Sequence, residues 1–343
     1  MSWACHPPKW QLIRTIGCLL LSLLAVSCAG YSPRRVKPVM GKNDWSSFDG
    51  KVMPWRSGNP VAKAKTKAVV ITIHGLSGAA SDFWMLEQDW PKLGIAVYGL
   101  QLRGQGNDPD LHLRGDIESS RTWKKDLRAF HDLVKEQYPD TPVFWYAESL
   151  GTLIALHTYA DYLYGEKPGK QPAGIILSSP VAGLRYRPTG MKECLIHTAV
   201  LTVPWFKVNL EKLAHVDDTK IRVTHDTTFA QQMAITPHYV PKLSLRLLGQ
   251  IDEMIMESRD VARKVDVPVL MLGSPNDVIA TEEQVQQLYD TLASKDKTLE
   301  WYRQSYHLLL HDVEREKVMA DVTGWVEQQI KDTKTLHKIP GRL

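Results

Sequence analysis

The chain has 343 residues, of which 43% are hydrophobic and 23% charged, and its formal net charge at pH 7 is +4. These values fit a globular protein, built either as one large domain with an insertion or as two small domains, and they exclude a disordered or fibrous chain. The small charge comes without a basic stripe carrying interleaved aromatic residues, so nucleic acid is not an expected partner.

The N-terminal segment has the three parts of a secretory signal. Lys9 and Arg14 precede an apolar stretch at 16–26, and small residues follow. The stretch is shorter than the roughly 20 residues that a membrane-spanning helix needs. The letters LLAVSC resemble a bacterial lipobox, in which the cysteine is lipidated and becomes the mature N-terminus. We therefore expect a signal peptide at 1–27, then lipidated Cys28 and a tether over 28–44. An uncleaved anchor and an ordinary secretory signal are the alternatives.

The residue after Cys28 predicts where such a lipoprotein goes. By resemblance to Gram-negative lipoproteins, the absence of Asp there favours the outer membrane, with the protein in the bacterial cell envelope facing the periplasm. Of the four cysteines, Cys5 and Cys18 would leave with the signal peptide and Cys28 would carry lipid. Cys194 alone remains, so we expect no intramolecular disulfide.

From Lys67 onward, apolar runs rich in β-branched residues alternate with helical patterns. The runs lie at 68–75, 94–102, 141–147, 173–179, 267–274 and 298–303. The clearest helical pattern is formed by Trp123, Leu127, Phe130 and Val134, spaced four, three and four residues apart. Near-continuous apolar strands separated by helices predict an α/β fold with a mostly parallel sheet covered by helices on both faces.

One region interrupts this alternation. Residues 182–262 are rich in helix formers and show no convincing series of strands. We expect a helical cap there, inserted into a core formed by residues 45–181 and 263–335. Such a cap would lie over the ends of the strands.

Reactive side chains follow four of the apolar runs. In open α/β sheets, ligands bind beyond the carboxyl ends of the strands. His74, Ser149, Asp277 and His307 stand at such positions. These four residues are therefore the candidates for a site at one edge of the sheet.

Ser149 lies in the pattern A-x-S-x-G, between a predicted strand and a predicted helix. A tight strand–turn–helix elbow presents a serine hydroxyl and requires small flanking residues, here Ala147 and Gly151. The alternative is a buried serine that hydrogen-bonds into the following helix. The strand before and the helix after favour the nucleophile.

A serine nucleophile needs a base, and the base needs an acid that orients it. The chain order Ser149, Asp277, His307 is the order found in α/β-hydrolases. His307 is the leading base, with His311 as its alternative, although His311 is expected at the surface. Asp277 lies in the turn-rich stretch GSPND and could also be a simple turn former.

The remaining site candidates surround the reacting carbonyl. An oxyanion needs backbone N–H donors, which we expect from Leu150, directly after the serine, and from Leu76 in the HGLSG loop. Phe83 and Trp84 could line a substrate-binding acyl pocket, with packing in the core as the alternative.

The chain resembles the α/β-hydrolases of the monoacylglycerol lipase, lysophospholipase and serine aminopeptidase-like group over residues 45–330. The resemblance rests on HGLSG, LRGQGND, YAESLGTLIAL, LMLGSPNDVI and SYHLLLHD. The family usually has His where Gln105 stands and Gly where Ala147 stands, and neither change removes a predicted catalytic residue. The resemblance implies a helical cap, a serine hydrolase and a single-chain lipid ester as substrate.

Other kinds of site find little support in the sequence. The remaining histidines show neither HExxH nor paired-cysteine spacing, so no metal is expected. No P-loop is present, and Pro109 replaces the third glycine of a dinucleotide fingerprint, so no cofactor is expected. An acyltransferase, thioesterase or peptidase on the same machinery, or a non-catalytic binding lipoprotein, remains an alternative. The oligomeric state is left open.

Overall fold

The computed structural model describes residues 36–164, 170–209 and 222–336. The predicted signal peptide, Cys28 and the first part of the tether lie outside these ranges. Within them, no helix is both long and apolar enough to cross a bilayer.

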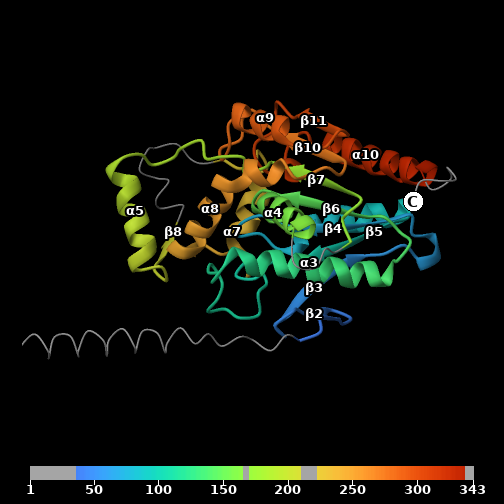
Figure 1. Ribbon diagram of the computed structural model, residues 1–343, viewed down its shortest axis with the longest axis horizontal. Helices are drawn as coiled ribbons and strands as arrows, with labels where there is room; N and C mark the ends of the chain where they lie inside the picture. The colour runs from blue at the N-terminus through green and yellow to red at the C-terminus, as the bar shows by residue number, and fades with distance from the viewer. Residues whose placement is uncertain (1–35, 165–169, 210–221, 337–343) are drawn as a thin grey trace, which may run out of the picture. The chain divides into compact units, whose positions relative to one another are not determined.

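A nine-stranded sheet forms the centre of this part of the chain, in the order β1-β2-β3-β5-β4-β6-β7-β10-β11 (Figure 1). Six neighbouring strands run parallel: β5, β4, β6, β7, β10 and β11. The strands β1, β2 and β3 add an antiparallel edge next to β5. The strands are β1 (Val39–Met40), β2 (Asp44–Ser46), β3 (Val52–Gly58), β4 (Ala68–Ile73), β5 (Ile95–Leu100), β6 (Val143–Glu148), β7 (Gly174–Ser178), β10 (Val269–Gly273) and β11 (Lys297–Trp301).

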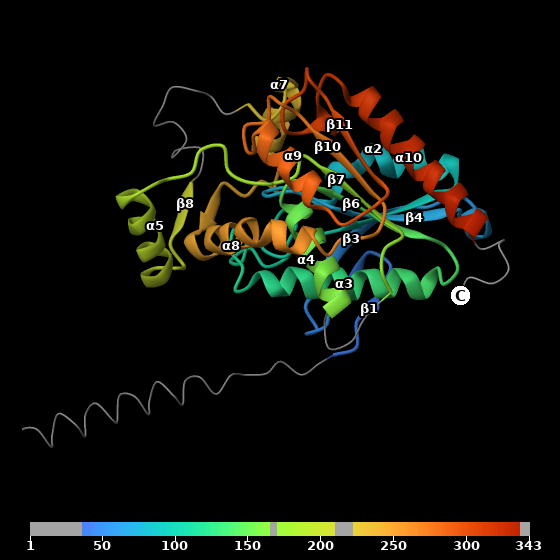
Figure 2. The same cartoon turned by 45° about the horizontal axis from the view of Figure 1, so that its top comes forward.

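Helices cover both faces of the sheet, which explains why the central strands read as unbroken apolar runs. Every residue of β4, β5 and β6 is buried. One face packs against α3 (Ser120–Gln137), α4 (Leu150–Tyr164), α8 (Leu245–Ala262) and α9 (Glu282–Thr291). The other packs against α2 (Trp84–Asp89) and α10 (Arg315–Leu336), as Figure 2 shows. Short 3-10 helices are η1 (Lys63–Lys65), η2 (Ala80–Phe83), η3 (Trp90–Leu93) and η4 (Leu309–His311).

The described part of the 182–262 insertion contains α5 (Met191–Thr202), α7 (Thr227–Ile235) and α8. It also contains a small antiparallel pair, β8 (Lys207–Asn209) with β9 (Lys242–Ser244), which the expectation of a purely helical cap missed. Strands of three residues are too short to give a periodic pattern. In Figures 1 and 2, α5 and α8 lie toward one end of the sheet, on the side where α4 begins.

Candidate active site

Ser149 occupies the turn between β6 and α4 in a left-handed backbone conformation, with φ of 52°. Its N–H donates to the carbonyl of Ser178 at 3.0 Å, which fixes the turn against β7. A Cβ on Gly151 would lie 2.2 Å from the carbonyl oxygen of Ile73, so only glycine fits there. The local sequence therefore folds as a strained elbow that presents the Ser149 hydroxyl.

Three residues far apart in the sequence meet at this elbow. The Ser149 hydroxyl donates to His307 Nε2 at 2.8 Å, and His307 Nδ1–H donates to Asp277 Oδ2 at 2.8 Å. Asp277 follows β10 and His307 follows β11, so parallel strands bring both to the same edge of the sheet. Asp277 is held in turn by Ile279 N–H, which donates to its Oδ1 at 2.7 Å. All three side chains are buried.

Ser149 and His307 line a cavity of about 930 Å³. Its apolar wall comes from α5 and α8, and Ile196, Val200, Leu248, Ile251, Ile255 and Met256 all line it. This volume is near the upper end of the ~300–1,000 Å³ found for small-molecule sites. The site therefore joins a hydrogen-bonded Ser–His–Asp set to a space that suits an apolar substrate.

The family of the chain follows from its sequence over this same region. A profile of the family described as serine aminopeptidase, S33, matches residues 64–314. The chain belongs to this family.

Individual relatives of this S33-family chain are distant. It is 25% identical to phospholipase YtpA of Bacillus subtilis, over 80% of this chain and 99% of that protein. It is 24% identical to an abhydrolase domain-containing protein of Dictyostelium discoideum, over 83% of this chain but only 29% of the relative's length. A soluble variant of monoglyceride lipase from Saccharomyces cerevisiae, solved with a substrate analog, superposes with a TM-score of 0.69 at 18% identity, over 87% of this chain and 98% of that one. These likenesses confirm the predicted α/β-hydrolase fold.

The electrostatic surroundings of His307 favour its protonated form. Burial alone would lower the pKa of His307, but the charge and hydrogen bond of Asp277, with the charge of Glu148, raise it above its ordinary value. An imidazole of this kind is well suited to accept a proton from a hydroxyl and return it to a leaving group.

Two buried carboxyl groups near His307 were missed by the sequence analysis. Burial and the nearby charge of Asp82 raise the pKa of Glu148 to about 7, and burial raises the pKa of Asp82 to about 6. Both side chains line the cavity together with Ser149 and His307. Glu148 is the last residue of the buried strand β6 and its only charged one. A charge at the end of an apolar run was the sequence signal that could have revealed it. Asp82 carries no comparable signal in the sequence.

The predicted oxyanion loop lies beside the elbow. A Cβ on Gly75 would come 3.1 Å from Ser149 Cβ, and both Leu76 and Leu150 line the cavity next to Ser149. His74, which starts this loop, is fully buried, and burial lowers its pKa to about 4, so it is neutral. Its Nδ1–H donates to Gly75 O at 2.8 Å, and its Nε2 accepts from Leu102 N–H at 3.0 Å. His74 therefore joins the oxyanion loop to the LRGQGND segment.

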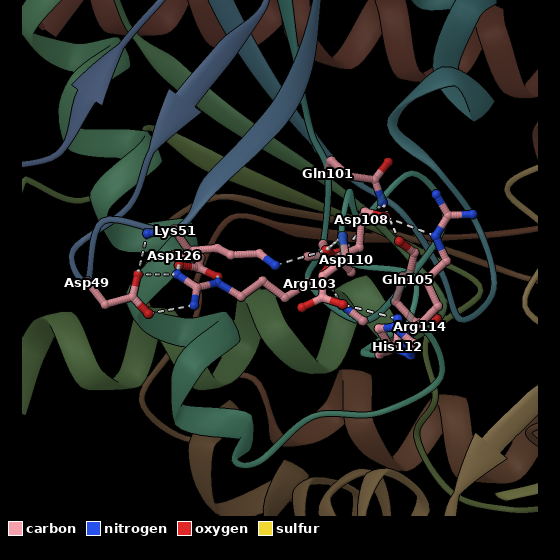
Figure 3. Close-up of polar contacts among 12 residues, drawn as sticks. Asp49, Lys51, Gln101, Arg103, Gln105, Asp108, Asp110, His112, Arg114 and Asp126 are labelled. Atoms are coloured by element: carbon pink, nitrogen blue, oxygen red, sulfur yellow. Dashed lines mark hydrogen bonds and ion pairs between the residues drawn. The ribbon is translucent and has the colours of Figure 1, made fainter. Parts of the chain in front are cut away.

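The LRGQGND segment supports that loop and is itself held by polar contacts, which Figure 3 shows. Gln105, at the position where the family usually has His, accepts from Ser77 N–H at 2.8 Å through its side-chain oxygen. Ser77 itself has a positive φ of 58°. Arg103 fixes the segment through ion pairs with Asp49 at 2.6 Å and Asp126 at 2.7 Å. With Gln105 in place of the family's usual His, the segment still holds Ser77, the residue that follows Leu76, through a hydrogen bond.

The pocket placement of Phe83 and Trp84 and the surface placement of His311 differ from the structure, whereas packing in the core, the other reading of Phe83, agrees with it. Phe83 is buried in the core with its ring against Tyr146, and Trp84 is 43% exposed. Neither lines the cavity. Phe83, the last residue of η2, packs in the core on the face of the sheet that α2 and α10 cover, and Trp84, the first residue of α2, is not part of that core. His311, expected at the surface, is buried, and its Nε2–H donates to Asp82 O at 2.9 Å.

No group of three or more His, Cys, Asp or Glu side chains within residues 36–164, 170–209 and 222–336 is arranged to hold a metal ion.

Proposed function

We propose that the protein hydrolyses carboxylic esters of single-chain lipids, such as monoacylglycerols or lysophospholipids, through an acyl-enzyme on Ser149. The observation that carries this proposal is the hydrogen-bonded set of Ser149, His307 and Asp277, of which Ser149 and His307 line a largely apolar cavity. The likeness to a phospholipase and to a monoglyceride lipase supports the ester class.

In the first half of the reaction, Ser149 Oγ attacks the carbonyl carbon of the ester while its proton passes to His307 Nε2. Asp277 stabilises the imidazolium that forms. The carbonyl oxygen becomes negative, and the N–H groups of Leu76 and Leu150 are the proposed donors to it. Leu150 is the first residue of α4, so the positive end of that helix dipole also favours the oxyanion.

In the second half, the tetrahedral intermediate collapses and the alcohol leaves with the proton from His307, so that the acyl group remains on Ser149. A water molecule then gives a proton to His307 Nε2 and attacks the acyl carbon. The fatty acid departs, and the proton returns from His307 to Ser149 Oγ. Every proton is accounted for without a cofactor.

The test is a substrate panel with the detergent-solubilised full chain. Fatty acid should be released from monoacylglycerols and lysophospholipids faster than from diacyl or triacyl lipids or from aminoacyl amides. Ser149→Ala should lower kcat on the order of 10⁶-fold, whereas Ser57→Ala, at an exposed position of β3, should change nothing. Turnover of the amides alone would make the chain a peptidase, and near-normal activity of Ser149→Ala would refute the site.

We also propose that Cys28, which lies outside the described residues, carries a lipid anchor in the outer membrane of a bacterial cell envelope. The lipobox-like sequence supports this. Anchoring by more than one acyl chain is stable at about 0.8 kcal/mol per buried CH₂, whereas a single chain is marginal. Cys28→Ala should move the protein to the soluble fraction with kcat on micellar esters unchanged, and Cys194→Ala should stay with membranes. If Cys28→Ala remains in the membrane fraction, the lipoprotein proposal fails.

A further inference from the structure

The loop that carries His307, residues 303–312, is held from two sides, and we name it the base loop. On the core side, the Ser179 hydroxyl donates to His307 O at 2.5 Å, and the Ser274 hydroxyl donates to Ser305 O at 2.5 Å. Neither contact involves the N–H groups of Tyr306 and Leu308, the residues on either side of His307. Because buried backbone groups are almost always hydrogen-bonded, we expect these N–H groups to have partners elsewhere.

One of these partners lies in a segment of the cap, residues 222–229, which we name the strap. Leu308 N–H, directly after His307, donates to Val223 O at 2.8 Å. Thr224 Oγ1 donates to His311 O at 2.5 Å. The strap therefore bonds to the main chain of the base loop within one residue of His307.

Asp312, the last residue of the base loop, joins the strap to the residue directly before His307. Its side chain is fully buried, and its Oδ1 accepts from the backbone N–H of His225 at 3.0 Å and from His225 Nδ1 at 2.8 Å. Its Oδ2 accepts from Tyr306 N–H, directly before His307, at 2.6 Å. A buried carboxylate needs such donors, and Val313 N–H also donates to Asp312 Oδ1 at 2.8 Å, so losing the His225 ring would remove one donor of four and, with it, the side-chain link between the strap and Asp312.

Two ring stacks reinforce the same junction. The His225 ring lies on Tyr306 at a centroid distance of 4.0 Å and an angle of 10°, and the Phe229 ring lies on His311 at 3.9 Å and 6°. His311 in turn bonds to Asp82 O on η2, beyond the oxyanion loop. Strap, base loop and η2 form one continuous set of contacts.

The strap also borders the substrate cavity. Val223 and Leu308, the pair joined by a backbone hydrogen bond, both line that cavity. An acyl chain in the cavity would therefore lie against Val223 and Leu308, whose hydrogen bond fixes the backbone directly after His307.

We propose that the strap positions the catalytic base, with His225, Asp312 and Phe229 as positioning residues, so that His307 meets Ser149 and Asp277 only when the cap is seated. The proposal rests on the proposed function of the triad. A misplacement of about 1 Å at a catalytic group can cost on the order of 100-fold in rate. Loss of the strap contacts should therefore reduce kcat strongly without abolishing it.

The experiment compares His225→Ala, Asp312→Ala and Phe229→Ala on two esters, 4-nitrophenyl acetate and 4-nitrophenyl laurate. The acetate is too short to fill the cavity, so any effect on it reports on the base. Each variant should lower kcat on the order of 10- to 100-fold on both esters, with KM nearly unchanged. The rate of Ser149 labelling by a small fluorophosphonate should fall in parallel, because that reaction needs the base but not a lipid substrate.

Asp226→Ala is the matched control. Asp226 lies in the strap and caps α7 by accepting from Phe229 N–H at 2.9 Å, but makes no hydrogen bond to the base loop. It should weaken α7 and leave kcat on the acetate ester within about threefold, well short of the loss from a misplaced base. Thermal unfolding of each variant separates loss of folding from loss of positioning, and His225→Gln serves where the alanine variant does not fold.

Three outcomes would overturn the proposal. A rise in KM confined to the laurate ester would make the strap a wall of the acyl pocket. An equal loss in Asp226→Ala would assign the effect to the general folding of the cap. Unchanged kcat in all variants would show that the base loop keeps its conformation without the strap. If the unmodified chain hydrolyses neither ester, the proposed function fails, and the fluorophosphonate rates still test the strap.

Discussion

Two histidine–carboxylate pairs in this molecule share a distance of 2.8 Å from the ring Nδ1 to a buried carboxylate, and they differ in the surroundings of the ring. His307 and Asp277 are both buried, and the second ring nitrogen of His307 faces the Ser149 hydroxyl. His225 pairs with buried Asp312, but its side chain is 37% exposed and its ring is stacked on Tyr306. The comparison teaches that the pair alone does not define a catalytic site. The group that faces the free nitrogen, and the exclusion of water around it, give the pair its role.

The largest expected difference concerns the histidines themselves. His307→Ala should lower kcat on the order of 10⁶-fold, because the base and the acid of the reaction are lost together. His225→Ala should retain most of that rate enhancement. Steady-state hydrolysis of 4-nitrophenyl acetate measures both. Equal losses of kcat in the two variants would show that His225 and His307 do not differ in role.

The carboxylates should differ less widely. Asp277→Asn should lower kcat by about 10⁴-fold, since an amide favours the wrong tautomer of His307. Asp312→Asn keeps one acceptor oxygen for His225 and should cost about tenfold through a displaced base loop. The same assay ranks the two variants, and an Asp312→Asn loss as large as that of Asp277→Asn would place Asp312 in direct contact with the chemistry.

His311 offers a sharper form of the comparison, because it is the other histidine in the base loop. Burial lowers its pKa to about 4, so it is neutral and serves as a hydrogen-bond donor and a stacking partner of Phe229. His311→Ala should lower kcat by about tenfold or less. A loss comparable with that of His307→Ala would transfer the role of base to His311.

The smallest effect should appear in pH dependence rather than in the maximal rate. The charge of Glu148 raises the pKa of His307, so Glu148→Gln should lower that pKa. Neutral His307 would then persist to lower pH, and the acidic limb of the kcat/KM profile should move to lower pH. Activity at the plateau should change little.

Asp82→Asn should move the same limb in the opposite direction. Removing the charge of Asp82 lowers the pKa of Glu148 from its value of about 7, so that Glu148 is ionised at lower pH and raises the pKa of His307 further. The pH profiles of both variants check this. Shifts in the same direction would show that the two carboxyl groups do not act on His307 through each other.

Much of the fold follows from the sequence because it depends on local patterns. Continuous apolar strands predicted a covered parallel sheet, and small residues around Ser149 predicted the elbow. Positions just after apolar runs placed Ser149, Asp277 and His307 at strand ends, and their chain order matched that of α/β-hydrolases. The structure brings the three into hydrogen-bond contact.

The contacts that the sequence did not reveal join distant segments without a motif. His225 and Asp312 are 87 residues apart, and nothing in either local pattern indicates their pairing. The raised pKa of Glu148 depends on burial next to Asp82, which only the fold creates. Phe83 could be read as a pocket residue, because it follows the oxyanion loop, or as a core residue, and only the fold shows that it packs in the core.

The most direct test of the account is the identification of the residue that reacts with a fluorophosphonate, by intact mass and peptide mapping of the full chain. The account predicts a single adduct on Ser149 of the unmodified protein, formed far more slowly in His307→Ala and only moderately more slowly in His225→Ala. An adduct on another residue, or labelling of His307→Ala at the normal rate, would contradict the assignment of Ser149 and His307 as nucleophile and base.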